Sequence, residues 1–407
     1  MAFGVVAVLV VFQVAALTVS FTDYEQEALP AISSLLGGHL GDFLAQLPAY
    51  GGSVILRAPA ALLANALGGS ELTVFHAMAV PCLVAALAFG VVLWAELAPA
   101  GRRAGVAAWL ALALIIANPV ILPALDIGHP EELLGAVLCA AAVFAAQRDR
   151  PLLAGVLLGL AGANKAWALL AVIPVLLALR GGRLTALATA VGVCGLVLAP
   201  MLLHGSHAVA QAGVARDTGT VFQPWQAWWF FGAHGATVHG LAEVKVGYRT
   251  GPAWLSAIAH PIVLGAPLAL AAAVATRGRR QDALLLLAAC LLLRCLLDPW
   301  NNAYYHLPFL VALTAHEALV RRRAPVGAVA ATVFVYGGIT IASTHISADA
   351  QAALYLAWSL PALAGMTFTL LAPQRMRALT APLLSAARAQ LPSLARLLTP
   401  ATPAANS

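Results

Sequence analysis

Charged residues are scarce in this sequence. Only 9% of its 407 residues are Asp, Glu, Lys or Arg, whereas 62% are hydrophobic. An ordinary soluble domain carries roughly 25% charged residues, so this composition excludes a soluble globular protein. Several apolar runs are about 20 residues long, the length that crosses the core of a bilayer. The sequence therefore predicts one polytopic, all-α membrane domain.

Disulfide and metal motifs are also missing. The five cysteines all lie inside apolar runs, so we expect neither a disulfide framework nor a CxxC metal site. They are Cys82, Cys139, Cys194, Cys290 and Cys295. No Asp-x-Asp motif occurs, and its nearest match is Asp23-Tyr24-Glu25. We therefore expect no required cofactor, and a divalent cation is an alternative that no motif supports.

The apolar runs predict twelve membrane crossings. The first, 2–20, has no basic stretch before it and no A-x-A site, so we interpret it as a retained helix rather than a signal peptide. The others lie at about 73–97, 105–122, 132–146, 152–164, 166–179, 185–203, 254–276, 282–297, 304–320, 325–343 and 350–372. Runs 152–164 and 166–179 reach only about 20 Å each, so we interpret them as a paired hairpin.

Arginines at alternate junctions orient the spans. They are Arg102, Arg103, Arg148, Arg150, Arg180, Arg183, Arg277, Arg279, Arg280 and Arg321 to Arg323. The positive-inside rule places these junctions and both termini in the cytoplasm. The prediction is a bacterial plasma-membrane protein with one catalytic domain, 1–372, and a partly disordered or amphipathic tail, 373–407. The outer loops, about 21–72 and 204–253, are long, whereas the inner ones are too short for a nucleotide-binding domain.

The first outer loop begins with three carboxylates, those of Asp23, Glu25 and Glu27. A carboxylate at the membrane surface can act as a general base on a hydroxyl group. Asp23 is our candidate because it is nearest to the end of the first helix, and Glu25 or Glu27 would substitute for it. A solvated acidic helix start explains the same pattern. Later in this loop, 53–69 is apolar but interrupted by Arg57, so we expect it to lie flat at the interface.

A short outer loop, 126–132, combines acids with a histidine. His129 is a candidate phosphate ligand and Asp126 a candidate sugar ligand. Its proline and two glutamates also suit the first turn of an ordinary helix, so both interpretations stay open.

Two cations lie where lipid surrounds the chain. Lys165 occupies the turn of the short hairpin, where an ionisable group is costly, which makes it a candidate ligand for a lipid phosphate. Snorkelling to the interface is the alternative. Arg294 lies inside an apolar run, four residues before Asp298, so it is either a phosphate ligand or part of a helical salt bridge.

Hydrogen-bonding side chains follow Arg294 closely. Asn301, Asn302 and Tyr304 are candidate substrate ligands, and His306 is a candidate phosphate ligand. A tryptophan-rich stretch, 223–231, is typical of a membrane interface.

Taken together, these segments resemble the polytopic type-C glycosyltransferases, and within them glycosyltransferase family 87, whose members use polyprenyl-phosphate sugars. The resemblance rests on Asp23-Tyr24, Tyr50-Gly51-Gly52-Ser53, the stretch 128–134 and the stretch 154–165. It covers the first half of the chain well and the second half only by topology. The family commonly has Gln where His129 stands, and Pro soon after the lysine of the hairpin.

The resemblance implies a type-C fold with interfacial helices between the first two spans. It implies Asp23 as the catalytic base and Lys165 as a ligand of the donor phosphate. The full set of candidates is Asp23 for catalysis, Tyr24, Glu25, Glu27, Tyr50, Arg57, Asp126, Asn301, Asn302 and Tyr304 for substrate, and Lys165, His129, Arg294 and His306 for phosphate.

The expected reaction inverts the anomeric carbon of a sugar, mannose or arabinofuranose. The expected partners are a polyprenyl-phosphate sugar donor, a glycolipid or glycan acceptor and membrane lipids, with no nucleic acid. A twelve-helix secondary transporter, or another lipid-handling membrane protein, is the alternative. Such transporters usually contain internal repeats, and no six-plus-six repeat is evident here.

Overall fold

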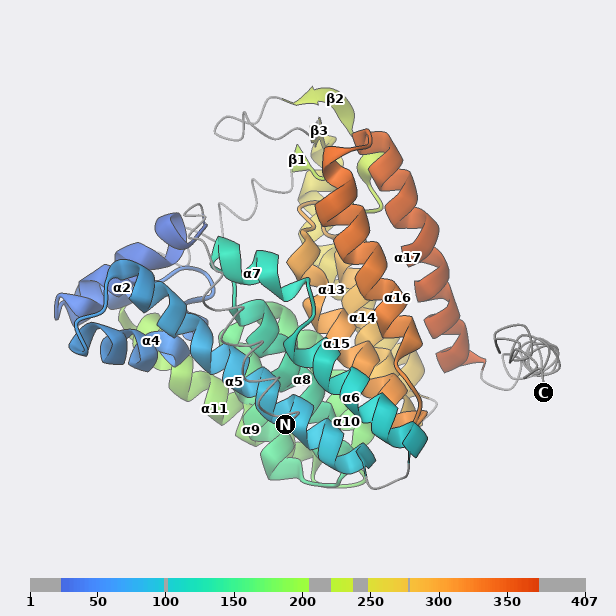
Figure 1. Cartoon of the computed structure of the whole chain (residues 1–407), viewed down its shortest axis with the longest axis horizontal. Helices are drawn as coiled ribbons and strands as arrows, with labels where there is room; N and C mark the ends of the chain where they lie inside the picture. The colour runs from blue at the N-terminus through green and yellow to red at the C-terminus, as the bar shows by residue number, and fades with distance from the viewer. Residues whose placement is uncertain (1–22, 99–101, 205–220, 237–247, 277–278, 373–407) are drawn as a thin grey trace, which may run out of the picture.

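The computed structural model of this chain describes residues 23–98, 102–204, 221–236, 248–276 and 279–372, and these are predominantly helical. Figure 1 shows a central bundle, a smaller group of helices around α2 and α4 beside it, and short strands above α16 and α17. The predicted first span, 2–20, and the tail, 373–407, lie outside the described residues.

The segment predicted to be the first outer loop, called the first outer segment below, folds as a small helical unit. Its elements are η1 (Tyr24–Ala28), α2 (Leu29–Leu36), α3 (Leu40–Ala45) and α4 (Gly51–Ala66). Apolar side chains of these helices form a core of their own, which includes Ile32, Phe43 and Val54. Leu63 and Leu67, near the end of α4, stay 63% and 80% exposed. Exposed leucines fit the interfacial location predicted for 53–69, which stays a prediction.

Two helices form the centre of the bundle. α8 (Glu131–Gln147) and α14 (Ala283–Leu297) are buried along almost their whole length. A helix that is apolar all round needs neighbours on every side. α8 has them in α5 (Glu71–Leu97), α9 (Pro151–Asn164), α10 (Val172–Ala178) and α15 (Leu307–Ala315).

The predicted hairpin consists of two short helical segments. α9 ends at Asn164, Lys165 has extended backbone angles, and the chain returns through η3 (Ala166–Ala171) and α10. Gly155 and Gly159 let α9 pack tightly on α11 (Arg183–His204). A β-carbon at either glycine would lie 2.6 Å from a carbonyl oxygen of α11, that of Ala186 or Ala190. Small residues spaced four apart are a common means of close helix packing in membranes.

The remaining helices surround this centre. They are α6 (Arg102–Ile116), α7 (Ile121–Ile127), α13 (Ala253–Ala275), η5 (Arg280–Asp282), η6 (Ala303–His306), η7 (His316–Val320), α16 (Val326–Val335), η8 (Tyr336–Ile341), η9 (Ala342–Thr344) and α17 (Ala348–Leu371).

By length and composition, five helical segments among the described residues can cross a membrane. These are Glu71–Leu97, Gly105–Ile127, Arg183–His204, Val326–Thr344 and Ala348–Leu371. α13 is a sixth candidate, bent by 48° beside Pro261, since proline removes a helical hydrogen bond. The structure thus agrees with a multi-pass membrane protein, and the predicted number of twelve crossings stays a prediction.

The structure fits the predicted all-α membrane protein and adds one small feature to it. The segment predicted to be the second outer loop, called the second outer segment below, contains a small antiparallel sheet in the order β1-β3-β2. Its strands are β1 (Val221–Phe222), β3 (Tyr248–Thr250) and β2 (Ala233–Ala236), and the turn η4 (Trp229–Phe231) lies between β1 and β2. Strands of two to four residues are too short for an alternating pattern to appear in the sequence. Arg249 of β3 donates to Asp349 of α17 at 2.8 Å, which fastens the sheet to the bundle.

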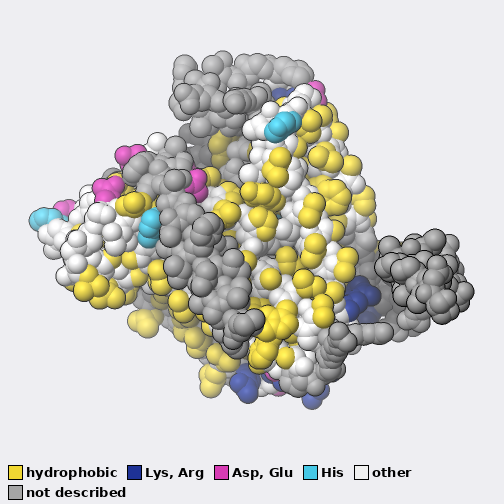
Figure 2. All heavy atoms as spheres, viewed as in Figure 1, with side chains coloured by type: hydrophobic (Ala, Val, Ile, Leu, Met, Phe, Trp, Pro, Cys, Tyr) yellow, Lys and Arg dark blue, Asp and Glu magenta, His cyan; other side chains and the backbone are white. Residues whose placement is uncertain are grey.

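The arginines of several junctions meet at one end of the bundle. Arg180 and Arg280, from two different junctions, both pair with Asp149, at 3.5 and 2.9 Å. Arg148 pairs with Glu96, and Arg322 lines the same cavity as these two residues. We call this region the arginine-rich end. Figure 2 shows Lys and Arg mainly along the lower edge of the molecule and Asp, Glu and His mainly on its upper part. This convergence supports the hairpin, because a single long helix would separate Asp149 from Arg180.

The arrangement predicts which positions face each side of the membrane. Asn65 on α4 and Gly181 at the arginine-rich end are both exposed, whereas the native cysteines are buried or half-buried. In intact cells, a membrane-impermeant maleimide should label Asn65→Cys at once and Gly181→Cys only after permeabilisation. The opposite pattern would place the arginine-rich end outside and reject the predicted orientation.

Candidate active site

The start of α8 organises a network of charged side chains. Gly128, which ends α7, has a φ of +103°, a conformation that glycine adopts most easily. A β-carbon there would lie 2.6 Å from Cβ of Tyr24, so only glycine lets the two segments approach this closely. The turn brings His129 beside the first outer segment and starts α8 with Glu131 and Glu132 in the protein interior.

His129 joins Asp23 to the buried network. Its Nε2 lies 3.0 Å from Oδ2 of Asp23 and its Nδ1 lies 2.6 Å from Oε1 of Glu131. Both ring nitrogens donate if the imidazole is charged. The ring stacks on Tyr304 and meets Tyr50 edge to face. Asp23 is the most exposed member, with 37% of its side chain accessible.

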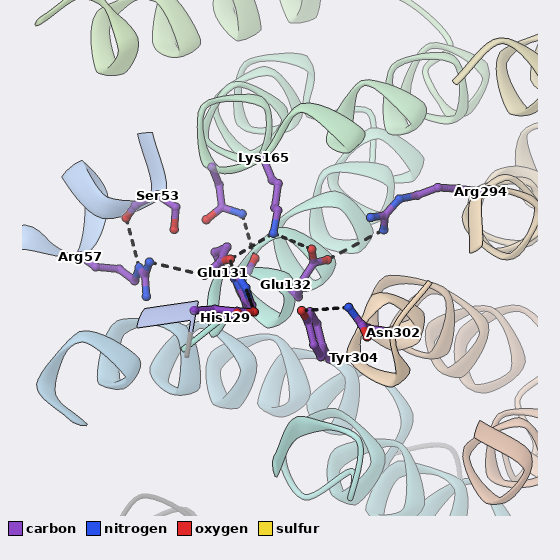
Figure 3. A network of polar contacts seen from close by, with 11 residues as sticks. Ser53, Arg57, His129, Glu131, Glu132, Lys165, Arg294, Asn302 and Tyr304 are labelled. Atoms are coloured by element: carbon purple, nitrogen blue, oxygen red, sulfur yellow. Dashed lines mark hydrogen bonds and ion pairs between the residues drawn. The ribbon is translucent and has the colours of Figure 1, made fainter. Parts of the chain in front are cut away.

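Glu131 and Glu132 are completely buried, and cations from three other elements surround them (Figure 3). Nζ of Lys165 lies 3.1 Å from Oε1 of Glu131 and 2.8 Å from Oε1 of Glu132. Arg57 of α4 lies 3.4 Å from Oε2 of Glu131, and Arg294 of α14 lies 4.0 Å from Oε2 of Glu132. The cations offset the desolvation of the carboxylates, which would otherwise cost several kcal/mol for each ion.

Backbone contacts hold Lys165 in place. The side-chain amide of Asn164 donates to the backbone oxygen of Glu131 at 2.9 Å, which ties the end of α9 to the start of α8. Gly52 packs directly on the carbonyl of Ala163, where a β-carbon would clash. This contact explains why the stretch Tyr50-Gly51-Gly52-Ser53 carries glycine at that position. It also brings α4, and therefore Arg57, to the same place.

Aromatic rings pack against two of the cations. Nζ of Lys165 lies 5.0 Å from the centre of the Tyr50 ring, and the guanidinium of Arg294 lies between Trp167 and Tyr305, at 5.4 and 4.8 Å. Such contacts stabilise a cation without consuming its hydrogen-bond donors.

Several buried donors around the network make no hydrogen bond to a described residue, although the two arginine nitrogens among them belong to the ion pairs with Glu131 and Glu132. They are Oγ of Ser53, Nη2 of Arg57, Nε1 of Trp167 and Nη1 of Arg294. Buried polar groups in native proteins are nearly always hydrogen-bonded, to protein or to something bound. These donors come from three elements, α4, η3 and α14, and surround the same carboxylates. They therefore indicate a site for a ligand rich in acceptor oxygens.

The predicted cluster after Arg294 is divided between two places. Tyr304 lies in the network, and its hydroxyl accepts from Nδ2 of Asn302 at 3.3 Å. Asn302 in turn accepts from Gln223 of the second outer segment at 3.2 Å. Asn301 instead donates to the backbone of Trp225 and to Tyr355, so it fastens that segment rather than facing the network.

His306 is also directed away from the network. Its Nε2 lies 3.0 Å from the hydroxyl of Tyr355, and its Nδ1 faces the backbone oxygens of Asn302 and Ala303. Both ring nitrogens of His306 therefore have partners within the chain. An imidazole held in this way faces Tyr355 and not the carboxylate network. We therefore do not retain His306 among the phosphate ligands.

Three predicted acids lie at the edge of the site or outside it. Glu25 is exposed on η1, and Asp126 is half-buried near the end of α7. Glu27 lies close to Tyr50. Burial raises the pKa of the Tyr50 phenol well above its ordinary value of 10, and the nearby negative charges of Glu131 and Glu27 raise it further. Tyr50 is therefore a neutral member of the site.

The sequence interpretation missed the central residues, Glu131 and Glu132. It treated them as the acidic first turn of an ordinary helix, whereas the structure buries both between cations. It also offered Asp298 as the helical partner of Arg294, whereas the structure places Glu132 beside that guanidinium. The sequence does contain a pattern that points to these two residues. Two adjacent acids opening a helix without further charge need cations nearby, and the lysine and arginines in the apolar runs were the candidates.

His129 is positively charged in this setting. Burial disfavours its charged form, but the attraction of Glu131 and the hydrogen bonds to Asp23 and Glu131 outweigh this cost and raise its pKa to about 9.

Acidic and histidine side chains can also bind a metal ion when they have the arrangement that it requires. Among the described residues, no group of three or more His, Cys, Asp or Glu side chains is arranged to hold a metal ion.

One comparison with known proteins gives a match. The family model described as glycosyltransferase family 87 matches residues 52–299, more than half of the chain. This range contains α4, α8, the hairpin and Arg294, and it begins after Asp23. No curated protein and no solved structure matches the chain significantly.

The raised pKa of His129 predicts a pH-dependent contribution to stability. A group whose pKa is higher in the folded protein stabilises it fully below the unfolded pKa, about 6.5, and loses this effect as the pH rises through about 9. His129→Gln should therefore lower the melting temperature most below pH 6.5 and progressively less up to pH 9. A thermal shift series from pH 6 to 10 measures the difference. A constant difference would show that folding does not raise the pKa of His129.

Proposed function

The chain belongs to glycosyltransferase family 87 and is a membrane glycosyltransferase, and we propose that it uses a polyprenyl-phosphate sugar as its donor. The acceptor would be a hydroxyl group of a glycolipid or glycan on the extracytoplasmic side. Mannose is the first candidate sugar and arabinofuranose the second, both from the family resemblance. Family membership favours this activity over the secondary transporter.

The proposal rests on the buried donors around Glu131 and Glu132 that make no hydrogen bond. A phosphate oxygen placed among Ser53, Arg57 and Arg294 would give these buried donors the acceptors that they lack. The charges agree. Four cations, Arg57, His129, Lys165 and Arg294, face the carboxylates of Asp23, Glu131 and Glu132. The single positive excess matches the single negative charge of a phosphodiester that links a lipid to a sugar.

Lys165 is not an isolated lysine in the membrane, as the sequence suggested, because two buried glutamates contact its ammonium group. Its ammonium has three donors; it donates one hydrogen bond to Glu131 and forms an ion pair with Glu132, so these contacts engage at most two donors. One remains for the phosphate, so the carboxylates orient the lysine rather than compete with the ligand. Removal of the lysine would also leave two buried carboxylates with less compensation, so Lys165→Ala should lose stability as well as donor binding.

Asp23 is the proposed general base. It is exposed enough to meet an acceptor, and the bond from His129 to Oδ2 fixes its orientation. The acceptor oxygen attacks the anomeric carbon while Asp23 takes its proton. The bond from that carbon to the phosphate oxygen breaks, and the electron pair leaves with the polyprenyl phosphate. The cations stabilise the charge that develops on the leaving group, and a single displacement inverts the anomeric configuration.

A donor panel tests this function. Purified protein in liposomes should transfer sugar from polyprenyl-phosphate mannose, or failing that from polyprenyl-phosphate arabinofuranose, to a lipid-linked glycan acceptor. Mass spectrometry of the product should show one added sugar, and NMR of its anomeric proton should show the inverted configuration. Transfer from a nucleotide sugar but from neither lipid donor would reject the proposed donor class.

Asp23→Asn should separate catalysis from binding. The amide keeps the size of the side chain but cannot accept the proton, so turnover should fall by about 10²-fold or more while donor affinity is retained. Asp42→Asn is a matched control, since Asp42 is an exposed carboxylate on α3 of the same helical unit. Normal turnover in Asp23→Asn with inactive Glu25→Gln or Glu27→Gln would move the base along the segment. Normal turnover in all three variants would reject this base.

A further inference from the structure

The arginine-rich end contains a second cavity, remote from the network. It has a volume of about 960 Å³ and lies between α14, α15, α16 and α17. Pockets for small molecules typically have about 300–1,000 Å³. α8 starts at the network and ends beside Arg148 at the arginine-rich end. Its 17 residues separate the two regions by about 25 Å. The cavity is therefore no part of the site described above.

One end of the cavity is cationic. Arg279, Arg321 and Arg323 line it together with two carboxylates. Both carboxylates already have partners in the chain, because Asp282 pairs with Arg279 at 2.9 Å and Glu317 accepts from the backbone of Ala328 at 3.0 Å. Within the described residues, neither Arg321 nor Arg323 has an ion pair within 4.0 Å. Two exposed guanidinium groups at this end therefore remain for an anion.

A buried histidine lines the same cavity. His316 is only 3% exposed, and neither of its ring nitrogens has a hydrogen-bond partner in the described part of the chain. A buried imidazole without partners is costly, so it indicates a ligand with polar atoms close to the arginines.

The other end of the cavity is apolar. Phe334 and Trp358, whose rings stack 5.8 Å apart, lie on its wall with Ala362 and Met366. Trp358 and Thr369 both line the cavity and lie eleven positions apart on α17, which is about 16 Å along the helix. Gly365 leaves the space beside it open, since a β-carbon there would meet no atom within 4 Å. α16 and α17 lie at the edge of the bundle in Figure 1, where lipid can reach them.

We propose that this cavity binds one anionic phospholipid from the leaflet at the arginine-rich end. Its phosphate lies near Arg321, Arg323 and His316, and one acyl chain lies between α16 and α17. A soluble phosphate or a nucleotide would leave the apolar part unfilled, and a neutral lipid would leave the arginines unpaired. The occupant is thus both anionic and acylated.

Native mass spectrometry of the delipidated full-length protein tests the proposal, with dioleoyl phosphatidylglycerol and dioleoyl phosphatidylcholine as probes. The wild type should retain one phosphatidylglycerol and much less phosphatidylcholine. The double variant R321Q/R323Q should lose at least about tenfold in affinity, because each basic side chain near an anionic lipid contributes about a factor of five. R322Q is the matched control. Arg322 lines the neighbouring cavity with Arg148, so affinity should be unchanged.

A second pair of variants tests the acyl chain without changing charge. Gly365→Leu fills the apolar part and should abolish retention, whereas Gly192→Leu, at an equally open position on α11, should not. Both should keep the wild-type melting temperature in lipid-free detergent. Equal retention of the two lipids, unchanged affinity in R321Q/R323Q or in folded Gly365→Leu, or displacement of phosphatidylglycerol by inorganic phosphate would each overturn the proposal.

Discussion

Burial of two adjacent carboxylates at the start of α8 is the constraint on which the upper half of this molecule depends. Glu131 and Glu132 have no exposed surface, and α8 continues from them into the densest part of the bundle. Breaking a buried ion pair by removing one partner typically costs about 3–5 kcal/mol. The fold must therefore bring cations to this point from elsewhere in the chain. It does so from α4, from the turn after α9 and from α14, so that one electrostatic requirement joins three separate regions.

Close backbone packing makes this convergence possible. The glycines of α9 let it lie directly on α11, Gly52 lets α4 rest on the end of α9, and Gly128 lets the start of α8 approach Tyr24. Apolar burial provides no net drive between helices in lipid, so association depends on close contact and on polar bonds. The same contacts that hold the helices together also set the positions of Lys165 and Arg57. Stability and the geometry of the site have a common cause.

The two ends of the bundle use arginine in different ways. In the network, Arg57 and Arg294 are buried, and each forms an ion pair with a glutamate through a nitrogen that makes no hydrogen bond. At the opposite end, several accessible arginines pair with Glu96 or Asp149 across the junctions between helices, whereas Arg279 pairs with Asp282 of its own junction. An exposed pair contributes little to stability, whereas a buried cation with an unused donor is costly unless something binds there. Burial thus distinguishes the cations of the site from the cations on the surface.

The sequence by itself determined the class of the protein, the positions of most helices, the short hairpin and many of the polar residues that meet at the site. These follow from local properties, because hydropathy over a window and charge at the junctions depend little on distant parts of the chain. It also singled out Asp23, His129, Lys165 and Arg294 individually. Only the tertiary structure decided which of them meet, that Glu131 and Glu132 lie at the centre, that His306 faces Tyr355 instead, and that the second outer segment forms a sheet. The reason is physical. Whether an acid at a helix start is solvated or buried depends on segments more than thirty residues away, and periodicity carries no information about them.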